Sequence, residues 1–307
     1  MKYRTLGKDF TVSAVGRGCM GMSHGYGKPR DKKEMTELLA QAVDFGYTFF
    51  DTAEVYGTPD NPHANETLLG EALKPFRNRI QIGTKFGIHF DLDSPATNKP
   101  IVTDARPEVI RQSVDASLQR LQTDHIDIYY QHRQDPKVPV EEVASVMADL
   151  IKEGKILHWG LSEVDADTLR RAHAVCPVTA VQNRYSMMAR WYEPMFPVLE
   201  ELNVGLVAFS PMANGLLSGR YDSHSHFEKG NGLPQHHAPV PGKEYGKESG
   251  THPLDPGTGS PEECHAGPDF PGLDALQKAL DRPHPGYDEP GPPQGKRRCR
   301  RHCPHAG

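Results

Sequence analysis

Four polar residues of the kind used in proton-transfer chemistry stand at or just beyond the ends of short apolar segments. Asp51 ends an apolar run of strand length, and Tyr56 follows it in a loop next to a glycine. Lys85 ends a second such run and His132 a third. A free tyrosine has a pKa of about 10, and a nearby ammonium group lowers that pKa because it stabilises the phenolate. We therefore interpret Tyr56 as a proton donor, Lys85 as the ammonium beside it, and Asp51 as the carboxylate that holds Lys85.

His132 completes this set, because an imidazole can donate a hydrogen bond to a substrate carbonyl oxygen as negative charge develops there. The set suits the reduction of a carbonyl group, with a hydride from elsewhere and the proton from Tyr56. Taken singly, each residue has an ordinary explanation: a carboxylate at a strand end, a loop tyrosine, a lysine in a rim salt bridge, and a core imidazole with satisfied hydrogen bonds. The chemical interpretation requires that neighbouring strands bring all four side chains to one point.

Strands and helices alternate along the first 230 residues, after a predicted N-terminal β-hairpin over residues 3–13. Helices with a 3.6-residue apolar period separate the strands. Helical crossovers between successive strands indicate a parallel sheet. Right-handed crossovers leave two main closures, an open doubly wound sheet and an eight-stranded barrel. The segments predicted to be strands are residues 13–20, 47–51, 79–84, 126–130, 156–161, 178–182 and 205–209.

A glycine pattern bears on the choice between these closures. Gly16, Gly18 and Gly21 match the spacing of a dinucleotide-binding turn, but the chain continues into a further glycine-rich loop instead of a helix. We interpret these glycines as structural. We expect an α/β fold of the (β/α)8 TIM-barrel type, in which side chains at the carboxyl ends of the strands converge on one mouth.

The composition changes after residue 230. Of 307 residues in all, the segment 231–307 holds 14 of the 27 prolines and 12 of the 29 glycines, with no isoleucine and a single valine, Val240. Such a segment buries too little apolar surface to offset the entropy of ordering it. We therefore expect a barrel domain over residues 1–230 and a tail over 231–307 that is disordered or encoded in a shifted reading frame.

Charge and cysteine usage bear on the partners and the compartment. The net charge of -5 gives no general attraction to nucleic acid, and no apolar run approaches the ~20 residues of a membrane helix. We recognise no signal peptide, and the five cysteines are scattered and odd in number, which is typical of a reducing compartment. We expect a cytoplasmic protein that acts on a small molecule and binds neither nucleic acid nor membrane, with its oligomeric state open.

Five ordered motifs resemble those of the aldo-keto reductase superfamily, in particular its bacterial, fungal and plant branch of short-loop reductases. The resemblance runs from Tyr3 to about Gly230. It implies a TIM barrel, although the family's eighth strand, last large helices and adenosine-phosphate loop are not recognised in the tail, so that the barrel is expected to be incomplete. The motifs are Asp-Thr-Ala-Glu-Val-Tyr-Gly from residue 51, Gly-Thr-Lys-Phe-Gly from 83, Tyr-Tyr-Gln-His-Arg from 129, Trp-Gly-Leu-Ser-Glu from 159, and Phe-Ser-Pro-Met-Ala-Asn-Gly-Leu-Leu-Ser-Gly from 209.

The resemblance also implies roles for individual residues. Tyr56 matches the family's general acid, and Lys85 and Asp51 match its supporting pair. His132 matches the histidine that orients the carbonyl group. The implied reaction is NADPH-dependent reduction of an aldehyde or ketone to an alcohol. The positions that match cofactor-binding residues, or would line the same pocket, are Met20, Ser162, Glu163, Gln182, Phe209, Ser210, Met212 and Asn214.

Three positions depart from the usual residues of the family. Glu163 stands where Asn is commoner, and Phe209 keeps the ring that stacks on nicotinamide but lacks its usual hydroxyl. Arg17 stands where the family has an apolar residue, and nothing in the sequence explains it. Family habit implies NADP(H) as the cofactor, with NAD(H) as the alternative, because the residues that would select the adenosine phosphate are not recognised.

Two other functions compete with carbonyl reduction. The chain could be a truncated, inactive relative of the reductases or a module that only binds the cofactor. A metal-dependent barrel hydrolase is disfavoured because no His-x-His follows the first strand. Cys299, His302, Cys303 and His305 in the tail only loosely match the spacing of zinc ligands, so no metal site is expected.

Overall fold

A computed structural model of the chain describes residues 1–26, 28–96, 99–213 and 217. All of these residues belong to one unit of the chain, Met1–Thr258. The predicted domain boundary at residue 230, and the tail that follows it, lie outside the described residues.

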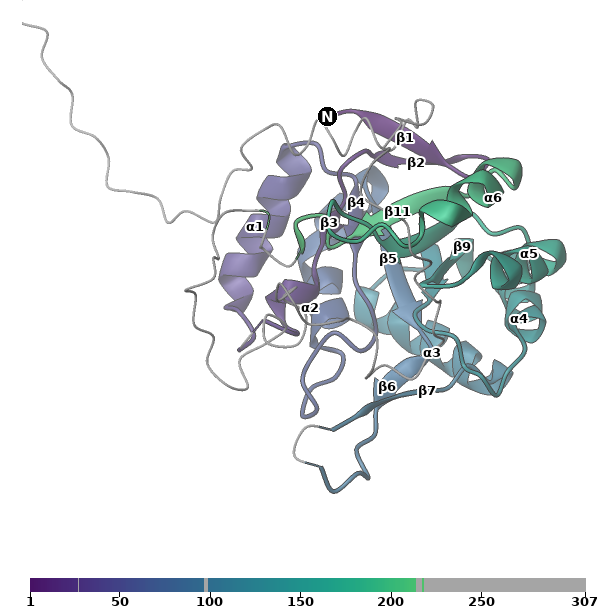
Figure 1. The fold of residues 1–307 in the computed structure, drawn as a ribbon. Helices are drawn as coiled ribbons and strands as arrows, with labels where there is room; N and C mark the ends of the chain where they lie inside the picture. Colours follow the sequence, from purple (N-terminus) through teal and green to yellow (C-terminus); the bar gives the residue numbers. More distant parts are fainter. Residues whose placement is uncertain (27, 97–98, 214–216, 218–307) are drawn as a thin grey trace, which may run out of the picture. The chain divides into compact units, whose positions relative to one another are not determined.

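Seven parallel strands form the central sheet, in the order β11-β10-β9-β8-β5-β4-β3 (Figure 1). Each strand therefore pairs with the one that follows it along the chain within this sheet. That order is typical of a barrel, because a doubly wound sheet reverses its strand order part-way. The predicted α/β barrel is confirmed in the form of a nearly closed seven-strand barrel, and β3 and β11 are the edges of the sheet within the described residues. The strands are β3 (Arg17–Gly18), β4 (Phe49–Asp51), β5 (Gln81–Phe86), β8 (Ile126–Gln131), β9 (Ile156–Ser162), β10 (Ala180–Arg184) and β11 (Gly205–Phe209).

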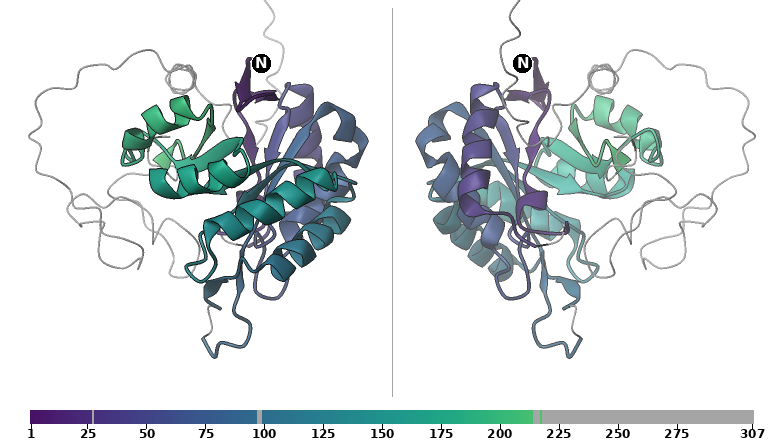
Figure 2. Two further views of the ribbon diagram at one scale, coloured as in Figure 1. Left: turned by 90° about the vertical axis from the view of Figure 1, so that its right-hand side faces the viewer. Right: turned by 90° about the vertical axis from the view of Figure 1, so that its left-hand side faces the viewer.

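The helices lie outside the sheet and contribute buried apolar residues to the main core cluster (Figures 1 and 2). In α4, for example, Val143, Met147 and Leu150 are fully buried, as expected for residues spaced three or four apart on one helix face. Asp31 caps the start of α1, where its carboxylate accepts the N–H of Glu34 at 2.9 Å. The helices are α1 (Lys32–Asp44), α2 (Ala64–Leu73), α3 (Pro107–Leu121), α4 (Val140–Lys152), α5 (Ala166–Val175) and α6 (Phe196–Glu201), with short 3-10 segments η1 (Met20–Met22), η2 (Lys74–Arg79) and η3 (Glu193–Met195).

A β-hairpin, β1 (Tyr3–Leu6) with β2 (Phe10–Ser13), covers the amino-terminal ends of the barrel strands. Its Phe10 ring meets the ring of Phe49 on β4 edge-on, with centroids 5.9 Å apart. The hairpin and the inner faces of the strands share one apolar cluster, which also contains Ile128 and Tyr130. This confirms the predicted hairpin, and it leaves the carboxyl ends of the strands as the open end.

Two segments differ from their predicted structure. Residues 13–20 contain a barrel strand of only two residues, β3, because Ser13 ends β2 and Met20 begins η1. Residues 87–103, which lie outside the segments predicted to be strands, contain a second hairpin, β6 (Ile88–Phe90) with β7 (Ile101–Thr103). It lies at the opposite end of the barrel from β1 and β2 (Figures 1 and 2). Its alternation of buried and exposed residues is only three residues long in β6, too short to stand out in the sequence.

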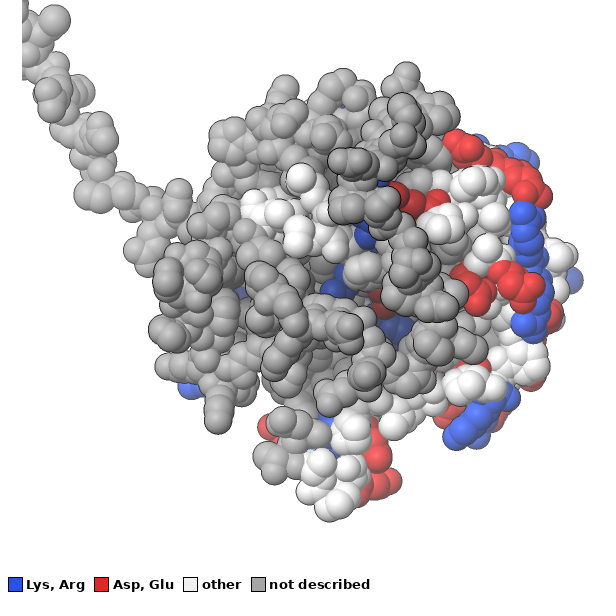
Figure 3. Space-filling view, in the orientation of Figure 1, with Lys and Arg blue, Asp and Glu red and all other residues white. Residues whose placement is uncertain are grey.

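The surface drawn in Figure 3 carries acidic and basic side chains next to one another along the edge formed by α4, α5 and α6. Arg170 pairs with Glu201, and Arg171 pairs with Glu141 at 2.7 Å. Such exposed pairs contribute little to stability, because water and salt screen the two charges. Because acidic and basic side chains alternate along this edge, it carries no continuous basic stripe. Within the described part of the chain, no helix combines the length and apolar character required to cross a membrane.

Candidate active site

Lys85 and Asp51 form an ion pair at the carboxyl ends of two adjacent strands. The Lys85 side chain is 0% exposed, and its Nζ donates to Asp51 Oδ1 at 2.6 Å and to the backbone oxygen of Thr52 at 2.6 Å. Burial lowers the pKa of Lys85, but the neighbouring Asp51 and Tyr56 raise it by more, so that its pKa lies above the ordinary value. Lys85 is therefore a buried side chain that keeps its positive charge.

Tyr56 lies next to this ion pair, in the loop that follows β4. Its ring centroid is 4.8 Å from Lys85 Nζ, and its hydroxyl forms a hydrogen bond with that group. The backbone oxygen of Tyr56 accepts hydrogen bonds from Ser23 Oγ at 2.9 Å and from the N–H of Asn65 at 3.1 Å. A Cβ at Gly57 would overlap the backbone that folds back over it, so only glycine fits beside the tyrosine. The loop thus fixes the position of the phenol.

The pKa of Tyr56 is shifted in the direction opposite to the sequence-based expectation. Burial raises it, Lys85 lowers it by a smaller amount, and the net pKa lies above the ordinary value of 10.0. The expected effect of Lys85 is therefore present, but the burial of the phenol, which outweighs it, could not be read from the sequence. Tyr56 is a neutral phenol near pH 7, which is the protonation state that a proton donor requires.

His132 directly follows β8 and is buried beside Tyr56, with ring centroids 5.6 Å apart in an edge-on arrangement. Its pKa lies well below the ordinary value of 6.5, because of burial and because of the positive charges of Lys85 and Arg133. The ring is therefore neutral. Its Nδ1 is buried without a hydrogen-bond partner among the described residues. With its proton on Nε2, the imidazole has a donor for an oxygen atom that enters the site.

Gln182 on β10 is hydrogen-bonded to Asp51 from a distant strand of the sheet. Its Nε2 donates to Asp51 Oδ2 at 2.8 Å. In the strand order, β9, β8 and β5 separate β10 from β4, so a bond between these two side chains crosses the interior of the barrel. Both oxygens of Asp51 are thereby occupied, one by Lys85 and one by Gln182.

Met20 and the hairpin residues form an apolar wall against Tyr56. Ile88 and Phe90 from β6 are buried in one cluster with Tyr56, and Met20 packs against that cluster. His24 adds a ring stacked on Tyr56, with centroids 5.8 Å apart, and its Nδ1 lies 2.6 Å from the backbone oxygen of Gly57. The side chains around the phenol are thus mainly apolar and aromatic, which is typical of small-molecule pockets.

The residues predicted to hold nicotinamide on β9 and β10 form one hydrogen-bonded group. Ser162 Oγ donates to the backbone oxygen of Gln182 at 2.9 Å, and the N–H of Glu163 donates to Asn183 Oδ1 at 2.8 Å. The Glu163 carboxylate pairs with Arg133 at 2.9 Å. Sequence reasoning missed Arg133 and Asn183, although each directly follows a predicted site residue, which was the available signal.

Phe209 ends β11, and Ser210 and Met212 follow it. The guanidinium of Arg184 lies over the Phe209 ring, 5.5 Å from its centroid. Ser210 has a positive φ of 53°, so the backbone turns sharply directly after the strand. Asn214 lies outside the described residues. These positions are at the carboxyl end of the edge strand β11, and Arg17 lies on the other edge strand, β3.

The aldo/keto reductase family model matches residues 14–255 of the chain. The chain belongs to the aldo/keto reductase family. The match extends past Gly230, where the sequence resemblance was expected to end. The probable aldo-keto reductase 1 of Glycine max is 41% identical over 215 residues, which are 69% of this chain and 60% of the relative. The chain therefore spans less than two thirds of the length of that relative.

Two solved structures show the same fold. The aldo-keto reductase AKR11C1 from Bacillus halodurans, in its holo form, has a TM-score of 0.65 and 30% identity, with 76% of this chain and 74% of that chain covered. The glycerol dehydrogenase AKR11B4 from Gluconobacter oxydans has a TM-score of 0.66 and 29% identity, with 74% and 68% covered. Both support the assignment of the barrel to this family.

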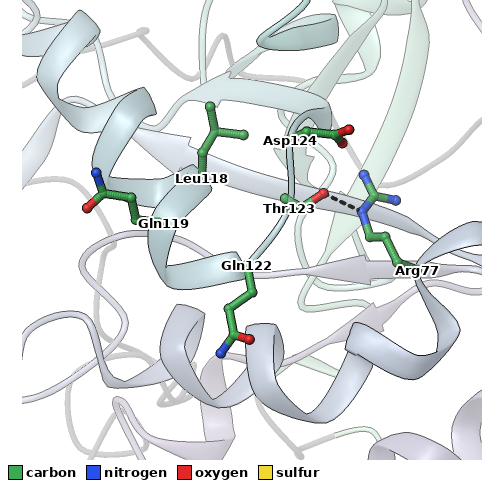
Figure 4. A pocket seen from close by; sticks show the side chains of 6 residues that line it. All are labelled: Arg77, Leu118, Gln119, Gln122, Thr123 and Asp124. Atoms are coloured by element: carbon green, nitrogen blue, oxygen red, sulfur yellow. Dashed lines mark hydrogen bonds between the residues drawn. The ribbon is translucent and has the colours of Figure 1, made fainter.

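A surface hollow at the other end of this aldo/keto reductase barrel carries no comparable chemistry (Figure 4). Its charged lining residues are Arg77 and Asp124, and Arg77 donates to Thr123 Oγ1 at 2.8 Å and pairs with Asp127 at 2.7 Å. The hollow lies beside residues that precede β5 and β8, at the amino-terminal ends of the strands, where barrels place stabilising residues. Its lining is Arg77, Leu118, Gln119, Gln122, Thr123 and Asp124.

Proposed function

We propose that this protein reduces an aldehyde or ketone to an alcohol, with NADPH as the hydride donor and Tyr56 as the proton donor. The proposal is supported by one observation above all: Tyr56 lies against the Lys85–Asp51 ion pair and against His132, in a chain of the aldo/keto reductase family. The presence of all four residues in one group argues against an inactive relative. Among the described residues no cluster of possible metal ligands occurs.

The residues on β9, β10 and β11 fit a nicotinamide ring and its carboxamide. The hydroxyl of Ser162 and the side-chain amide of Gln182 supply both donors and acceptors, as a carboxamide needs. Phe209 supplies an aromatic face at the end of β11. We therefore assign these three residues, together with Glu163 and Met20, to the cofactor. When bound, the nicotinamide supplies the hydride, and NADPH is preferred here over NADH from the resemblance to the family.

The protein's own residues handle the substrate and the proton. His132, neutral and buried, donates a hydrogen bond to the carbonyl oxygen and orients it. Tyr56 passes its phenolic proton to the same oxygen as negative charge builds up there. The Lys85 ammonium then stabilises the phenolate that remains, and Asp51 holds the ammonium in place. The apolar wall of Ile88 and its neighbours keeps water from the reacting oxygen.

The test is a kinetic comparison of the wild-type chain with Tyr56→Phe. We expect wild type to oxidise NADPH in the presence of an aromatic aldehyde, and Tyr56→Phe to lose a factor of about 10²–10⁴ in kcat with an unchanged Kd for NADPH. Parallel titrations with NADPH and NADH test the cofactor preference. Unchanged carbonyl reduction by Tyr56→Phe would disprove the assigned proton donor. An NADPH complex without any turnover would instead favour a cofactor-binding module.

A further inference from the structure

Glu54 is a buried carboxylate between Asp51 and Tyr56 that the proposed reaction does not use. The residue is 8% exposed. Its Oε1 accepts the backbone N–H of Gly87 at 3.1 Å, and its carboxylate also hydrogen-bonds Ser113 on α3. Gly87 follows β5 directly and lies two residues beyond Lys85. One side chain therefore connects the loop that carries Tyr56 to the chain segment that follows Lys85.

The backbone of Glu54 joins the same two segments. Its N–H donates to the backbone oxygen of Lys85 at 3.1 Å, and its own oxygen lies 2.6 Å from Nδ1 of His63. The Lys85 ammonium in turn donates a hydrogen bond to the backbone oxygen of Thr52. Three hydrogen bonds thus join the Tyr56 loop to the β5 segment, and the bond from Glu54 to Gly87 is the one made by the Glu54 side chain.

We propose that Glu54 is a positioning residue, whose carboxylate holds the Tyr56 loop against the end of β5 and so sets the distance between the phenol and the Lys85 ammonium. This inference rests on the proposed function, in that the distance matters because Tyr56 gives up a proton. The Glu54 carboxylate acts on the phenol and the ammonium indirectly, through its hydrogen bond to the backbone N–H of Gly87.

The charges that face Glu54 make this connection sensitive to pH. Glu66 on α2 is fully buried, and its carboxylate takes the Arg120 guanidinium at 2.6 Å and the Thr84 hydroxyl at 2.5 Å. Arg120 on α3 is thus paired with Glu66, while Tyr129 on β8 presents a neutral phenol whose pKa is raised well above 10.0 by burial. Burial and the negative charge of Glu66 raise the pKa of Glu54 to about 7.

Protonation of Glu54 replaces a carboxylate acceptor by a neutral one. A hydrogen bond to a charged acceptor is stronger than one to a neutral acceptor, so the Gly87 bond weakens as the pH falls below neutrality. In the same range His132 stays neutral, because its pKa lies well below 6.5, and Tyr56 stays protonated, because its pKa lies above 10.0. His132 and Tyr56 therefore do not account for a change in kcat around neutral pH, and the pH profile of Glu54→Gln tests whether Glu54 does.

Three variants test the inference. Glu54→Gln keeps the size and removes the charge, Glu54→Asp keeps the charge but shortens the reach to Gly87, and Glu66→Gln removes the neighbouring charge and leaves the Gly87 bond in place. We expect Glu54→Gln and Glu54→Asp to lower kcat at roughly pH 8 by about tenfold, with KM and the Kd for NADPH changed less than about twofold. Glu54→Gln should remove the rise in kcat between roughly pH 6 and pH 8, and Glu66→Gln should shift that rise to lower pH.

Amide hydrogen exchange over residues 83–90 gives a readout that does not depend on turnover. We expect faster exchange at Gly87 in Glu54→Gln and Glu54→Asp than in wild type, with circular dichroism showing that each variant is folded. The inference is overturned if Glu54→Gln and Glu54→Asp both show the kcat, the pH profile and the amide exchange at Gly87 of wild type. If wild type reduces no carbonyl compound, the proposed function fails by itself, and the exchange at Gly87 then decides whether Glu54 holds the loop.

Discussion

Replacement of Lys85 by methionine tests the charge on which the proposed proton transfer depends. The ammonium lies 4.8 Å from the centroid of the Tyr56 ring. At an effective dielectric constant of about 20, unit charges at that separation attract by roughly 3.5 kcal/mol. Asp51 lies on the same ammonium and opposes this effect, so we take about 1.5 to 3.5 kcal/mol as the range. Lys85→Met should therefore lower kcat by about ten- to three-hundredfold.

The assay is steady-state oxidation of NADPH with saturating aldehyde, together with the Kd for NADPH. Since Lys85 is not assigned to the cofactor, that Kd should change little. Lys155→Met is the matched control, because it also removes a lysine from an ion pair, with Asp115 at 2.7 Å, but at the surface and far along the chain from the site. We expect it to leave kcat within about twofold of wild type.

Loss of the fold must be separated from loss of chemistry. Lys85→Met leaves the partly buried Asp51, whose side chain is 17% exposed, without its cation, and the loss of one partner of a buried ion pair typically costs up to about 3–5 kcal/mol of folding free energy. The double variant Asp51→Asn/Lys85→Met removes both charges and keeps an acceptor for Gln182, so it should melt closer to wild type. A folded double variant with kcat within about threefold of wild type would refute the role of the ammonium.

Two further predictions concern pH and the opposite end of the barrel. Burial raises the pKa of Tyr56 above 10.0, so the phenol keeps its proton at alkaline pH. We expect kcat for reduction to stay level from roughly pH 8 until the pH passes the ordinary range of tyrosine. A decline in kcat centred near pH 8, in a profile that does not depend on the buffer, would contradict this. Arg77→Ala removes the partner of the largely buried Asp127 and should lower the free energy of unfolding by about 3–5 kcal/mol, measured by urea denaturation. Its kcat per folded molecule should equal that of wild type, and a large loss of kcat would show that the two ends of the barrel are coupled.

The sequence was sufficient to predict that the strand ends would meet. Asp51, Lys85 and His132 each end or follow a run of apolar residues, and a barrel of parallel strands brings such positions to one end. The weakest prediction was the first strand, because β3 has only two residues and its flanking residues belong to other elements. The β6–β7 hairpin was missed for a related reason, since Pro, Asp and Asn dominate the segment that connects its two short strands.

The contacts that tie the candidate site together were beyond sequence reasoning. The Gln182–Asp51 hydrogen bond joins residues 131 positions apart and depends on the curvature of the whole sheet. Glu54 carries no spacing signal either, because a glutamate in a loop is ordinarily exposed. Its burial follows from the packing of α2 and α3 over the loop, which is a tertiary property.

The raised pKa of Tyr56 and the presence of Lys85 beside it are compatible, because they act on different states of the phenol. Burial disfavours the phenolate in the resting site, so the proton stays on Tyr56 until another group draws it away. In the proposed reaction, the ammonium acts most strongly once negative charge has formed on the phenol oxygen during proton transfer. An interaction that is stronger in the transition state than in the resting state accelerates the reaction. Lys85 meets this condition only while Asp51 and the Thr52 carbonyl hold the ammonium in place, with Gln182 holding Asp51. We therefore expect these contacts, and not the resting pKa of the phenol, to decide whether Tyr56 can serve as the proton donor.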